Sequence, residues 1–467
     1  MKTEKPPLLI PVENQVRELD PKLLFACIAA RSGFSSIIGS HRILDFHIAS
    51  FPPSLYLNKS FTIMNLKMFK IMRKLGHQIV TWDEEALVHL PDEMYYSRRL
   101  SPLSLQYVSH LFAWGEDNAE LWRRYPQMPK DIPIHVTGNP RGDLLRPEMQ
   151  AFYKEDAAEI TKTYGNFILI NTNFNHVNAF YPSQNLFRPV KLAGDTPQFG
   201  KAAKGMSRKF AEALRDHKQA IFDHFKKLIP ALDRDFAEYN IVVRPHPTEN
   251  QTIYHEIATG CQRVHVTNEG NVVPWLMAAK ALLHNGCTTG VEAFAMGVPA
   301  ISYRVAINED IDEGFYRLSN GLSHQCFDYK HLRATLQKIL AGEIGVADGD
   351  ECKALLAHYL CAQEGKLACE RMVDVLEKIT ADRSELPPPP LNDRLLGRSL
   401  AYGRRLIKWT KSFIPGTHAP PEFHRHRYPG ISLDELRTRI ARFQKVLDDN
   451  TEIKAEQISD QIFQINT

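Results

Sequence analysis

Short apolar runs alternate with longer amphipathic stretches along most of this chain. In the first half, runs of this kind occupy 8–10, 36–39, 78–82, 111–114 and 134–136. A second series occupies 167–170, 241–243, 264–266, 281–283 and 300–303, and it contains a long helical stretch that ends near Leu228. Strands that alternate with helices form parallel sheets covered by helices on both faces. The pattern therefore predicts an α/β protein.

The break between the two series is a polar, acidic stretch from about Pro147 to Tyr164. We therefore expect two Rossmann-like domains, at 1–150 and 151–382, with a cleft between them. In open sheets of this kind, ligands bind at the carboxyl ends of the strands. Functional side chains are accordingly expected directly after strands.

The last part of the chain, 383–467, has a different pattern. Four prolines, from Pro387 to Pro390, stop any helix and stiffen a linker. Bulky apolar residues then recur at near-helical spacing up to Ile414, together with six basic residues: Arg394, Arg398, Arg404, Arg405, Lys408 and Lys411. A final helix begins with the capping-box pattern Ser432-x-x-Glu435. The tail is thus predicted to be helical, and its basic helix either packs on the protein body or lies at an anionic membrane surface.

Composition narrows the class of protein. The 467 residues are enough for two or three domains, and a hydrophobic content of 43% is ordinary for a globular protein. The net charge is only +3, so it gives no sign of a nucleic-acid partner, and none is expected. The seven cysteines form no Cys-x-x-Cys pair, as suits a reducing compartment. Because no apolar run approaches the ~18 residues of a membrane span, we expect a cytoplasmic protein, with peripheral contact to the inner membrane as an open alternative.

The strongest chemical signal is the segment Arg244-Pro245-His246-Pro247, directly after a predicted strand. The two prolines fix the backbone on both sides of His246, so the imidazole is presented rigidly at a strand end. A histidine in that position can hydrogen-bond or protonate a phosphate leaving group. The alternatives are a structural histidine in a rigid turn and an arginine that braces the loop.

A second signal is the turn from His284 to Ala293, which links a strand to a helix. It contains Asn285 and Gly286, and then Thr288 and Thr289 at the helix start. Free amides at a helix start, together with two hydroxyls, form an anion site, although ordinary helix capping explains threonines there equally simply. Glu292 either binds a ribose hydroxyl or complements the helix dipole.

A third signal is the acidic cluster Asp83-Glu84-Glu85, after the third predicted strand. A carboxylate at a strand end can act as a general base, but acidic clusters are also typical of solvated faces. Glu84 and Glu85 point in different directions, so at most one of them is the base. Asp-x-Asp pairs occur at 233–235, 310–312 and 348–350, of which only the second follows a strand. We expect neither a metal ion nor a cofactor.

Four segments together resemble a known family: 82–85, 137–141, 244–247 and 285–292. Over about residues 8–310 the chain is similar to bacterial surface carbohydrate biosynthesis proteins. More distantly, it resembles GT-B glycosyltransferases that use CMP-activated sugars, such as bacterial sialyltransferases and β-Kdo transferases. Those enzymes have an acidic pair followed by Gly, a His-Pro pair and a phosphate-binding Ser/Thr pair. The same order here is Glu84-Glu85, His246-Pro247 and Thr288-Thr289, with Ala86 in place of the Gly.

The resemblance implies transfer of a sugar, such as Kdo or another nonulosonic acid, from a CMP-activated donor to a glycan or lipid-linked acceptor during surface polysaccharide or lipopolysaccharide synthesis. Thr288 and Thr289 would bind the nucleotide phosphate, and Glu269 would bind the ribose. His246 would stabilise the phosphate as it leaves. A carboxylate, preferably Glu84, would activate the acceptor, without a metal ion. Further nucleotide-site residues in this interpretation are Arg244, Pro247, Asn285, Gly286 and Glu292.

Three other functions stay open on the sequence alone. A CDP-glycerol-type glycerophosphotransferase also uses Arg-x-His-Pro-like and Ser/Thr-Gly segments on this fold. A sugar-nucleotide 2-epimerase shares the pattern Gly-Asn-Pro-x-x-Asp, here from Gly138 to Asp143. The third is a non-catalytic polysaccharide-assembly protein. Fold does not separate these functions, because function depends on the site.

Overall fold

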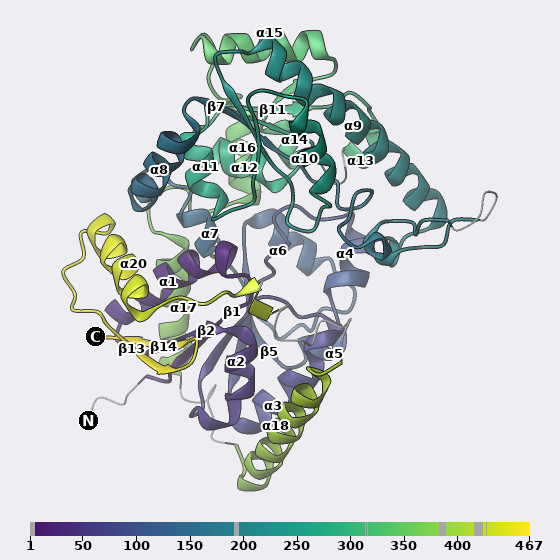
Figure 1. Ribbon diagram of the computed structural model, residues 1–467. Helices are drawn as coiled ribbons and strands as arrows, with labels where there is room; N and C mark the ends of the chain where they lie inside the picture. Colours follow the sequence, from purple (N-terminus) through teal and green to yellow (C-terminus); the bar gives the residue numbers. More distant parts are fainter. Residues whose placement is uncertain are drawn as a thin grey trace. The chain divides into compact units, whose positions relative to one another are not determined.

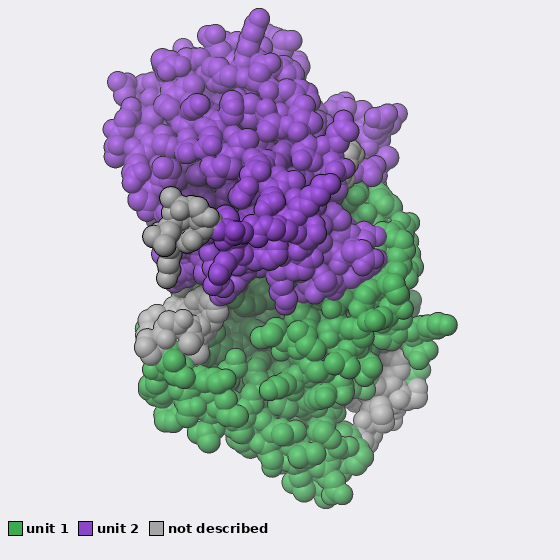
Figure 2. All heavy atoms as spheres, turned by 90° about the vertical axis from the view of Figure 1, so that its right-hand side faces the viewer, with its two compact units in different colours: residues 1–86, 99–152, 358–467 green, residues 87–98, 153–357 purple. Residues whose placement is uncertain are grey.

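The structure is a computed structural model that describes residues 5–190, 196–312, 314, 316–382, 389–414, 424–425 and 427–467. The chain forms two compact units, which are coloured separately in Figure 2. Unit 1 contains residues 1–86, 99–152 and 358–467, and unit 2 contains 87–98 and 153–357. The chain thus leaves unit 1 twice and returns to it for its last segment.

Unit 1 is built on an eight-stranded sheet with the order β13-β14-β2-β1-β3-β4-β5-β6. The six strands from β1 to β6 are parallel: β1 (Leu8–Val12), β2 (Ser36–Ser40), β3 (Leu55–Asn58), β4 (Gln78–Thr81), β5 (Val108–Ala113) and β6 (Ile134–Val136). The hairpin of β13 (Lys454–Ser459) and β14 (Ile462–Asn466) adds antiparallel to β2. The strand order reverses between β1 and β3, which is where sheets of this type bind ligands.

Unit 2 is built on a six-stranded parallel sheet with the order β9-β8-β7-β10-β11-β12. Its strands are β7 (Phe167–Asn171), β8 (Asn240–Arg244), β9 (Val264–Val266), β10 (Ala281–His284), β11 (Ala300–Tyr303) and β12 (His324–Cys326). Counted from β7, this is the order 3-2-1-4-5-6 of a Rossmann sheet. The switch point, where the order reverses, lies between β7 and β10.

Helices cover both sheets, as Figure 1 shows. Those of unit 1 are α1 (Gln15–Arg31), α2 (His41–Phe46), α3 (Leu66–Leu75), α5 (Pro102–Leu105), α6 (Glu116–Arg123), α7 (Pro140–Asp143), α17 (Ala368–Ala381), α18 (Leu391–Lys411) and α20 (Leu433–Val446). Helix α1 packs against α7, α17 and α20, whereas α18 packs against α2 and α3. Two boundaries between the units fall within helices: one near the end of α4 (Asp92–Arg99) and one near the end of α16 (Asp350–Tyr359).

The remaining helices belong to unit 2: α8 (Lys154–Tyr164), α9 (Arg208–Asp235), α10 (Thr252–Thr259), α11 (Val272–Ala278), α12 (Thr288–Ala295), α13 (Glu309–Asp312), α14 (Arg317–Gly321) and α15 (Tyr329–Leu340). Short 3-10 turns lie at Ile48–Ser50, Ile63–Asn65, Pro147–Tyr153, Pro182–Gln184 and Lys201–Ala203. Residues of α9, α10 and α15 share one hydrophobic core with the sheet. Helix α8 packs on α11, which also contacts α12 and β7.

All ten predicted strands are present, and the prediction of an α/β protein with two parallel sheets and helices near the C-terminus is confirmed. The structure adds β3, β12 and the β13–β14 hairpin, so the C-terminal region is not helical throughout. Helix α9 continues through Pro230 to Asp235, beyond the predicted end near Leu228. The fully buried side chains of Ile229 and Leu232 explain why, because their burial outweighs the backbone hydrogen bond that proline removes.

The basic segment after the prolines forms α18, which packs on α3. Pro387 and Pro388 of the predicted linker lie outside the described residues. Gly397 and Ala401 are the buried residues of α18, and a Cβ at Gly397 would lie 3.1 Å from both Leu75 Cγ and Lys74 Cβ. The helix therefore rests on α3 through a narrow face made of small residues.

Candidate functional site

The turn after β8 holds His246 in a fixed orientation. The backbone N–H of Thr248 donates to His246 Nδ1 over 3.2 Å, and the Thr248 hydroxyl lies 2.8 Å from the same nitrogen. Because a backbone N–H can only donate, Nδ1 is the acceptor, and the proton of the neutral imidazole is on Nε2. The side chain is partly exposed, whereas Pro247 beside it is exposed. The ring is thus held by one nitrogen, and the other nitrogen carries a proton.

Glu249 is the residue that fixes this turn, and the sequence motifs do not include it. Its side chain is almost fully buried, and its Oε1 accepts hydrogen bonds from His246 N, Phe174 N and Thr172 Oγ1 at 2.9–3.1 Å. Its Oε2 accepts from Tyr254 Oη at 2.6 Å. Burial raises the pKa of Glu249, although these hydrogen bonds act in the opposite direction. The carboxylate therefore joins the β8 turn to the segment that follows β7.

Arg244 serves the neighbouring loop. Its guanidinium donates to the carbonyls of Glu269 and Gly270 at 2.8 and 3.1 Å and lies 4.5 Å from the centre of the Trp275 ring. The Trp275 indole N–H also donates to the Glu269 carbonyl, at 2.9 Å. These contacts set the backbone of Glu269, whose side chain is exposed. Arg244 is therefore a brace that positions the predicted ribose-binding residue.

The turn after β10 is held from inside by His284. Gly286 N donates to His284 Nδ1 at 3.0 Å, and His284 Nε2 lies 2.8 Å from Ser323 Oγ. Burial lowers the pKa of His284 to about 3, so the ring stays neutral. Gly286 has φ +82°, and a Cβ there would lie 2.4 Å from the Tyr316 ring. Both the backbone conformation and the close ring require glycine at this position.

Helix α12 begins directly after this turn, at Thr288. Thr288 and Thr289 are partly exposed, whereas the fully buried ring of His284 lies under Gly290, where a Cβ would be 2.5 Å from Nε2. Glu292 is 5% exposed, one turn into the helix. Burial raises the pKa of the Cys287 thiol to about 11, and the charge of Glu292 contributes to this. The helix start thus presents two hydroxyls, while Glu292 faces the interior.

Asn285 links the two sides of the unit 2 switch point. Its Oδ1 accepts a hydrogen bond from the backbone N–H of Asn173 at 2.8 Å. Asn173 lies in the segment after β7. The next residue, Phe174, donates its backbone N–H to the Glu249 carboxylate. The structure therefore brings the His246 turn, the Asn285–Gly286 turn and the start of α12 together around the end of β7.

Glu84 and Glu85 belong to unit 1 and differ in their surroundings. Glu84 is buried; its Oε1 accepts from the Trp82 indole at 2.8 Å, and its Oε2 lies 3.7 Å from the Arg141 guanidinium. Within the described part of the chain, Oε2 has no hydrogen-bond partner. Glu85 is about half exposed and pairs with Arg17 at 3.1 Å. Arg17 lowers the pKa of Glu85 to about 2, which makes it a poor base.

Asp83, the third acid of the predicted cluster, has a structural role. Its buried carboxylate accepts two hydrogen bonds from the Arg99 guanidinium, and its carbonyl accepts one from the Trp114 indole at 2.8 Å. Its Oδ1 also accepts from the backbone N–H of Glu85 at 3.1 Å. Asp83 therefore shapes the turn that carries the two glutamates.

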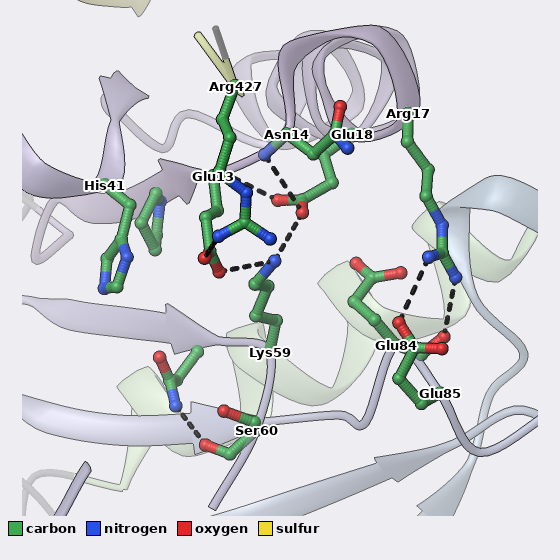
Figure 3. Close-up of polar contacts among 12 residues, drawn as sticks. Glu13, Asn14, Arg17, Glu18, His41, Lys59, Ser60, Glu84, Glu85 and Arg427 are labelled. Carbon is green, nitrogen blue, oxygen red and sulfur yellow. Dashed lines mark hydrogen bonds and ion pairs between the residues drawn. The ribbon is translucent and has the colours of Figure 1, made fainter. Parts of the chain in front are cut away.

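An ion cluster that the motifs do not include occupies the unit 1 switch point, between the ends of β1 and β3. Figure 3 shows Lys59, directly after β3, pointing at Glu13 and Glu18. Burial raises the pKa of Glu13, but the positive charges of Lys59, His41 and Arg427 outweigh this effect and lower the pKa to about 2. Glu18 also accepts from the backbone N–H groups of Glu13 and Asn14, at 3.0 and 3.2 Å. The cluster fixes the end of β1 at the start of α1.

Among the described residues, no three His, Cys, Asp or Glu side chains are grouped closely enough to hold a metal ion. Asp312, of the predicted Asp-x-Asp pair at 310–312, is paired with Arg304 at 2.7 Å. Within the described part of the chain, no helix has the length and apolar character needed to cross a membrane.

No protein-family model and no curated protein matches the sequence. Solved structures of the wall teichoic acid polymerase TagF are similar in fold. One, a histidine-to-asparagine variant soaked with CDPG for 15 minutes, has a TM-score of 0.50 and 12% identity, with 81% of this chain and 89% of that chain covered. Another structure of that variant has a TM-score of 0.51 and 11% identity, with coverage of 82% and 90%. The UDP-GlcNAc 2-epimerase of Methanocaldococcus jannaschii has a TM-score of 0.44 and 12% identity, with coverage of 79% and 99%. The TagF likeness supports the predicted GT-B-like fold of two Rossmann-like domains.

Proposed function

We propose that this protein is a glycosyltransferase that uses a nucleotide-activated sugar, with a CMP-activated sugar such as Kdo or another nonulosonic acid as donor. The observation that carries the proposal is the joining of two turns to the segment that follows β7, at the unit 2 switch point. Glu249 holds the His246 turn, and Asn285 holds the turn before α12, both against the segment that follows β7. A Rossmann sheet binds nucleotides at this place.

Unit 2 binds the donor in this proposal. The amides at the start of α12 and the hydroxyls of Thr288 and Thr289 bind the nucleotide phosphate, because a helix start is positively polarised. His246, with its proton on Nε2, donates to the phosphate as it leaves and so stabilises the developing charge. Glu269, on the loop held by Arg244, binds the ribose.

Unit 1 supplies the general base in this proposal, and Glu84 is preferred over Glu85. Arg17 keeps Glu85 ionised to about pH 2, so Glu85 has little tendency to take a proton near neutral pH. Glu84 has an oxygen that makes no hydrogen bond to the described residues, and the acceptor hydroxyl would be its partner. No metal ion is needed in this proposal, because hydrogen-bond donors aimed at the phosphate stabilise the negative charge that develops on it.

The acceptor is a glycan or lipid-linked sugar of bacterial surface polysaccharide or lipopolysaccharide, and the protein works on the cytoplasmic side of the membrane. The surface of α18 supports peripheral contact with that membrane. Large apolar residues along α18 and directly after it are 43–69% exposed: Leu391, Leu395, Leu396, Leu400, Tyr402, Leu406, Ile407, Trp409, Phe413 and Ile414. Basic residues are interspersed among them, as is typical of helices that lie in an anionic interface.

A thermal-shift comparison of CMP, CDP, UDP and GDP tests the donor. Saturation at 100 times the dissociation constant stabilises a protein by about 2.7 kcal/mol, and we expect CMP or CDP to have the largest effect. Thr288→Ala should weaken that effect, whereas Thr163→Ala, an exposed threonine on α8, should not. A preference for UDP would contradict the proposal and favour an epimerase. A clear preference for CDP over CMP would favour a CDP-glycerol-type glycerophosphotransferase. The TagF structure of similar fold was soaked with CDPG.

A further inference from the structure

Part of the segment that follows β7 runs antiparallel beside the turn that carries His246. Two backbone hydrogen bonds of 2.8 Å join them: Phe180 donates to the carbonyl of Thr248, and Asn250 donates to the carbonyl of Asn178. In an antiparallel pair, residues opposite each other have their side chains on the same face, and the two faces alternate along the chain. Because Phe180 lies opposite Thr248, their side chains lie on one face of this pair.

The burial of the side chains agrees with this division into two faces. Ala179 and Glu249, which form the antiparallel bridge, are 6% and 1% exposed. Thr248 and Phe180, one residue further along each segment, are both exposed, Phe180 to 61%. The Thr248 hydroxyl lies 2.8 Å from His246 Nδ1. The ring of Phe180 therefore shares an open face with the threonine that holds His246.

Tyr181 enlarges this apolar surface. It is 54% exposed, and the centre of its ring lies 4.9 Å from that of Phe180, with the two planes at 85°. The backbone is fixed on both sides, because Ala179 N donates to Asn185 Oδ1 and Gln184 N donates to the Tyr181 carbonyl, each at 2.8 Å. Single exposed apolar residues are common, but two adjacent exposed aromatic rings form a patch, and such patches mark interaction sites.

A sugar ring is the partner that this position favours. The face of an aromatic ring carries partial negative charge and attracts the C–H groups on the apolar face of a pyranose. In the proposed reaction, the donor sugar is bonded directly to the phosphate that His246 stabilises, and the acceptor hydroxyl must reach the same bond. The nucleobase is separated from that phosphate by the ribose. Aromatic rings next to His246 therefore meet a sugar and not a base.

We propose that Phe180 and Tyr181 form a stacking surface that binds and orients a sugar ring beside His246. The donor sugar and the acceptor glycan both present such a ring, and the experiment below separates these two sources. The position of the sugar next to the leaving phosphate rests on the proposed function. The binding of a sugar ring by the two aromatic side chains does not depend on which nucleotide the protein uses.

The experiment measures binding to the full-length protein by calorimetry and by saturation-transfer NMR. The probes are CMP, CMP-N-acetylneuraminate, free N-acetylneuraminate, N-acetylglucosamine and methyl β-galactopyranoside. The double variant Phe180→Ala, Tyr181→Ala should weaken binding of the sugar that occupies the surface by roughly 10-fold and leave CMP binding unchanged. The exchange variant Phe180→Tyr, Tyr181→Phe keeps two rings and should bind as wild type does. Phe327→Ala, at an exposed phenylalanine of the same unit, is the matched control.

The unfolding temperature shows whether a variant is intact, and it should not fall, because both side chains are more than half exposed. A loss confined to CMP-N-acetylneuraminate and free N-acetylneuraminate identifies the donor sugar as the ligand. A loss confined to N-acetylglucosamine or the galactoside identifies the acceptor. In each case, saturation should pass to the C–H protons of the sugar ring in wild type.

The results also separate this proposal from the proposed function. If the double variant binds every sugar probe as wild type does, or if wild type binds none of them, the stacking surface does not exist and the proposal is wrong. A loss of CMP binding in an intact double variant would show that the rings bind the nucleotide, which also overturns it. If wild type binds a sugar through the two rings but binds no CMP, the stacking surface stands and the proposed donor is wrong.

Discussion

His246 owes its orientation to residues close to it in the chain. The backbone N–H of Thr248 donates to one ring nitrogen of His246, and Glu249 accepts from the backbone N–H of His246. The prolines on either side restrict the backbone of the turn. The proline pattern was enough to predict a rigid histidine at a strand end. It was not enough to predict Glu249, because a glutamate three residues after a histidine is ordinary in loops. Only its partners in the segment after β7 and in α10 give it a role.

Replacing His246 tests its role in turnover. We expect His246→Ala to lower turnover by roughly 10²-fold or more, because the departing phosphate loses a proton donor. The fold should be intact, since Glu249 accepts from the backbone of residue 246 and not from its side chain. The measurements are steady-state turnover and the unfolding temperature. His255→Ala, at an exposed histidine of α10, is the control. Turnover close to that of wild type would show that the ring is only part of the turn.

Glu84 and Glu85 are distinguished by amide substitution. Glu84→Gln should lower turnover by roughly 10²-fold, because an amide does not accept a proton as a general base does. Glu85→Gln should have a small effect, since its partner Arg17 already makes the carboxylate a weak base. Glu84 is buried near Arg141, so unfolding temperatures must accompany the kinetics. If both variants retain activity, the base lies elsewhere; if only Glu84→Gln unfolds more easily without losing turnover, Glu84 is structural.

Among the strands, the apolar character of a run and its surroundings decided whether it could be predicted. Runs such as Phe167–Asn171 are wholly buried, and the sequence showed them directly. Strand β3 follows two prolines and contains only two aliphatic residues, Leu55 and Leu57, so its sequence did not stand out as a strand. Strand β13 is largely exposed and polar, and it is a strand only because β14 pairs with it and with β2. Local pattern does not contain such long-range pairing.

Replacing the two glycines of α18 by alanine should affect the stability of the helix differently. Gly403 has no neighbouring atom within 4 Å of an added Cβ, so Gly403→Ala should stabilise the helix by about 1 kcal/mol. Gly397 faces α3 at 3.1 Å, so the methyl group of Gly397→Ala must push the helices apart, which offsets the same gain. Hydrogen exchange of the α18 amides is the measurement. Slower exchange in Gly403→Ala than in Gly397→Ala is expected; the reverse order would mean that α18 does not dock on α3 as described.

Most strands of the two sheets could be predicted from the sequence, but their order within each sheet could not. Each switch point exists only because the strand order reverses, between β1 and β3 in unit 1 and between β7 and β10 in unit 2. The Lys59 cluster lies at the first of these places, and Glu249 joins two segments at the second; neither belongs to a motif. Their roles depend on which strands become neighbours, and local spacing does not determine that. The return of 358–467 to unit 1 is of the same kind, since it has no local signal.

The exposed surface of α18 combines basic and apolar residues, as a helix that lies on an anionic membrane does. Five of its six basic residues are exposed, and the sixth, Arg404, pairs with Asp45 at 3.1 Å. Each Lys or Arg near an anionic surface contributes about 1 kcal/mol, and the exposed apolar residues beside them add burial in the interface. The free energy is therefore sufficient for measurable binding to vesicles.

Co-sedimentation with anionic vesicles at low salt is the measurement, and full-length protein should appear in the pellet. Truncation after Asp382 is a poor probe, because it also removes β14, which pairs with β2 in the sheet of unit 1. The double substitution Trp409→Ser and Phe413→Ser leaves the buried face of α18 unchanged and should return the protein to the supernatant. Phe180→Ser with Tyr181→Ser, an exposed aromatic pair in unit 2, is the matched control and should sediment as wild type does. High salt should weaken binding, because it screens the basic residues. Equal sedimentation of the Trp409–Phe413 variant and wild type would show that α18 is not the surface that meets the membrane.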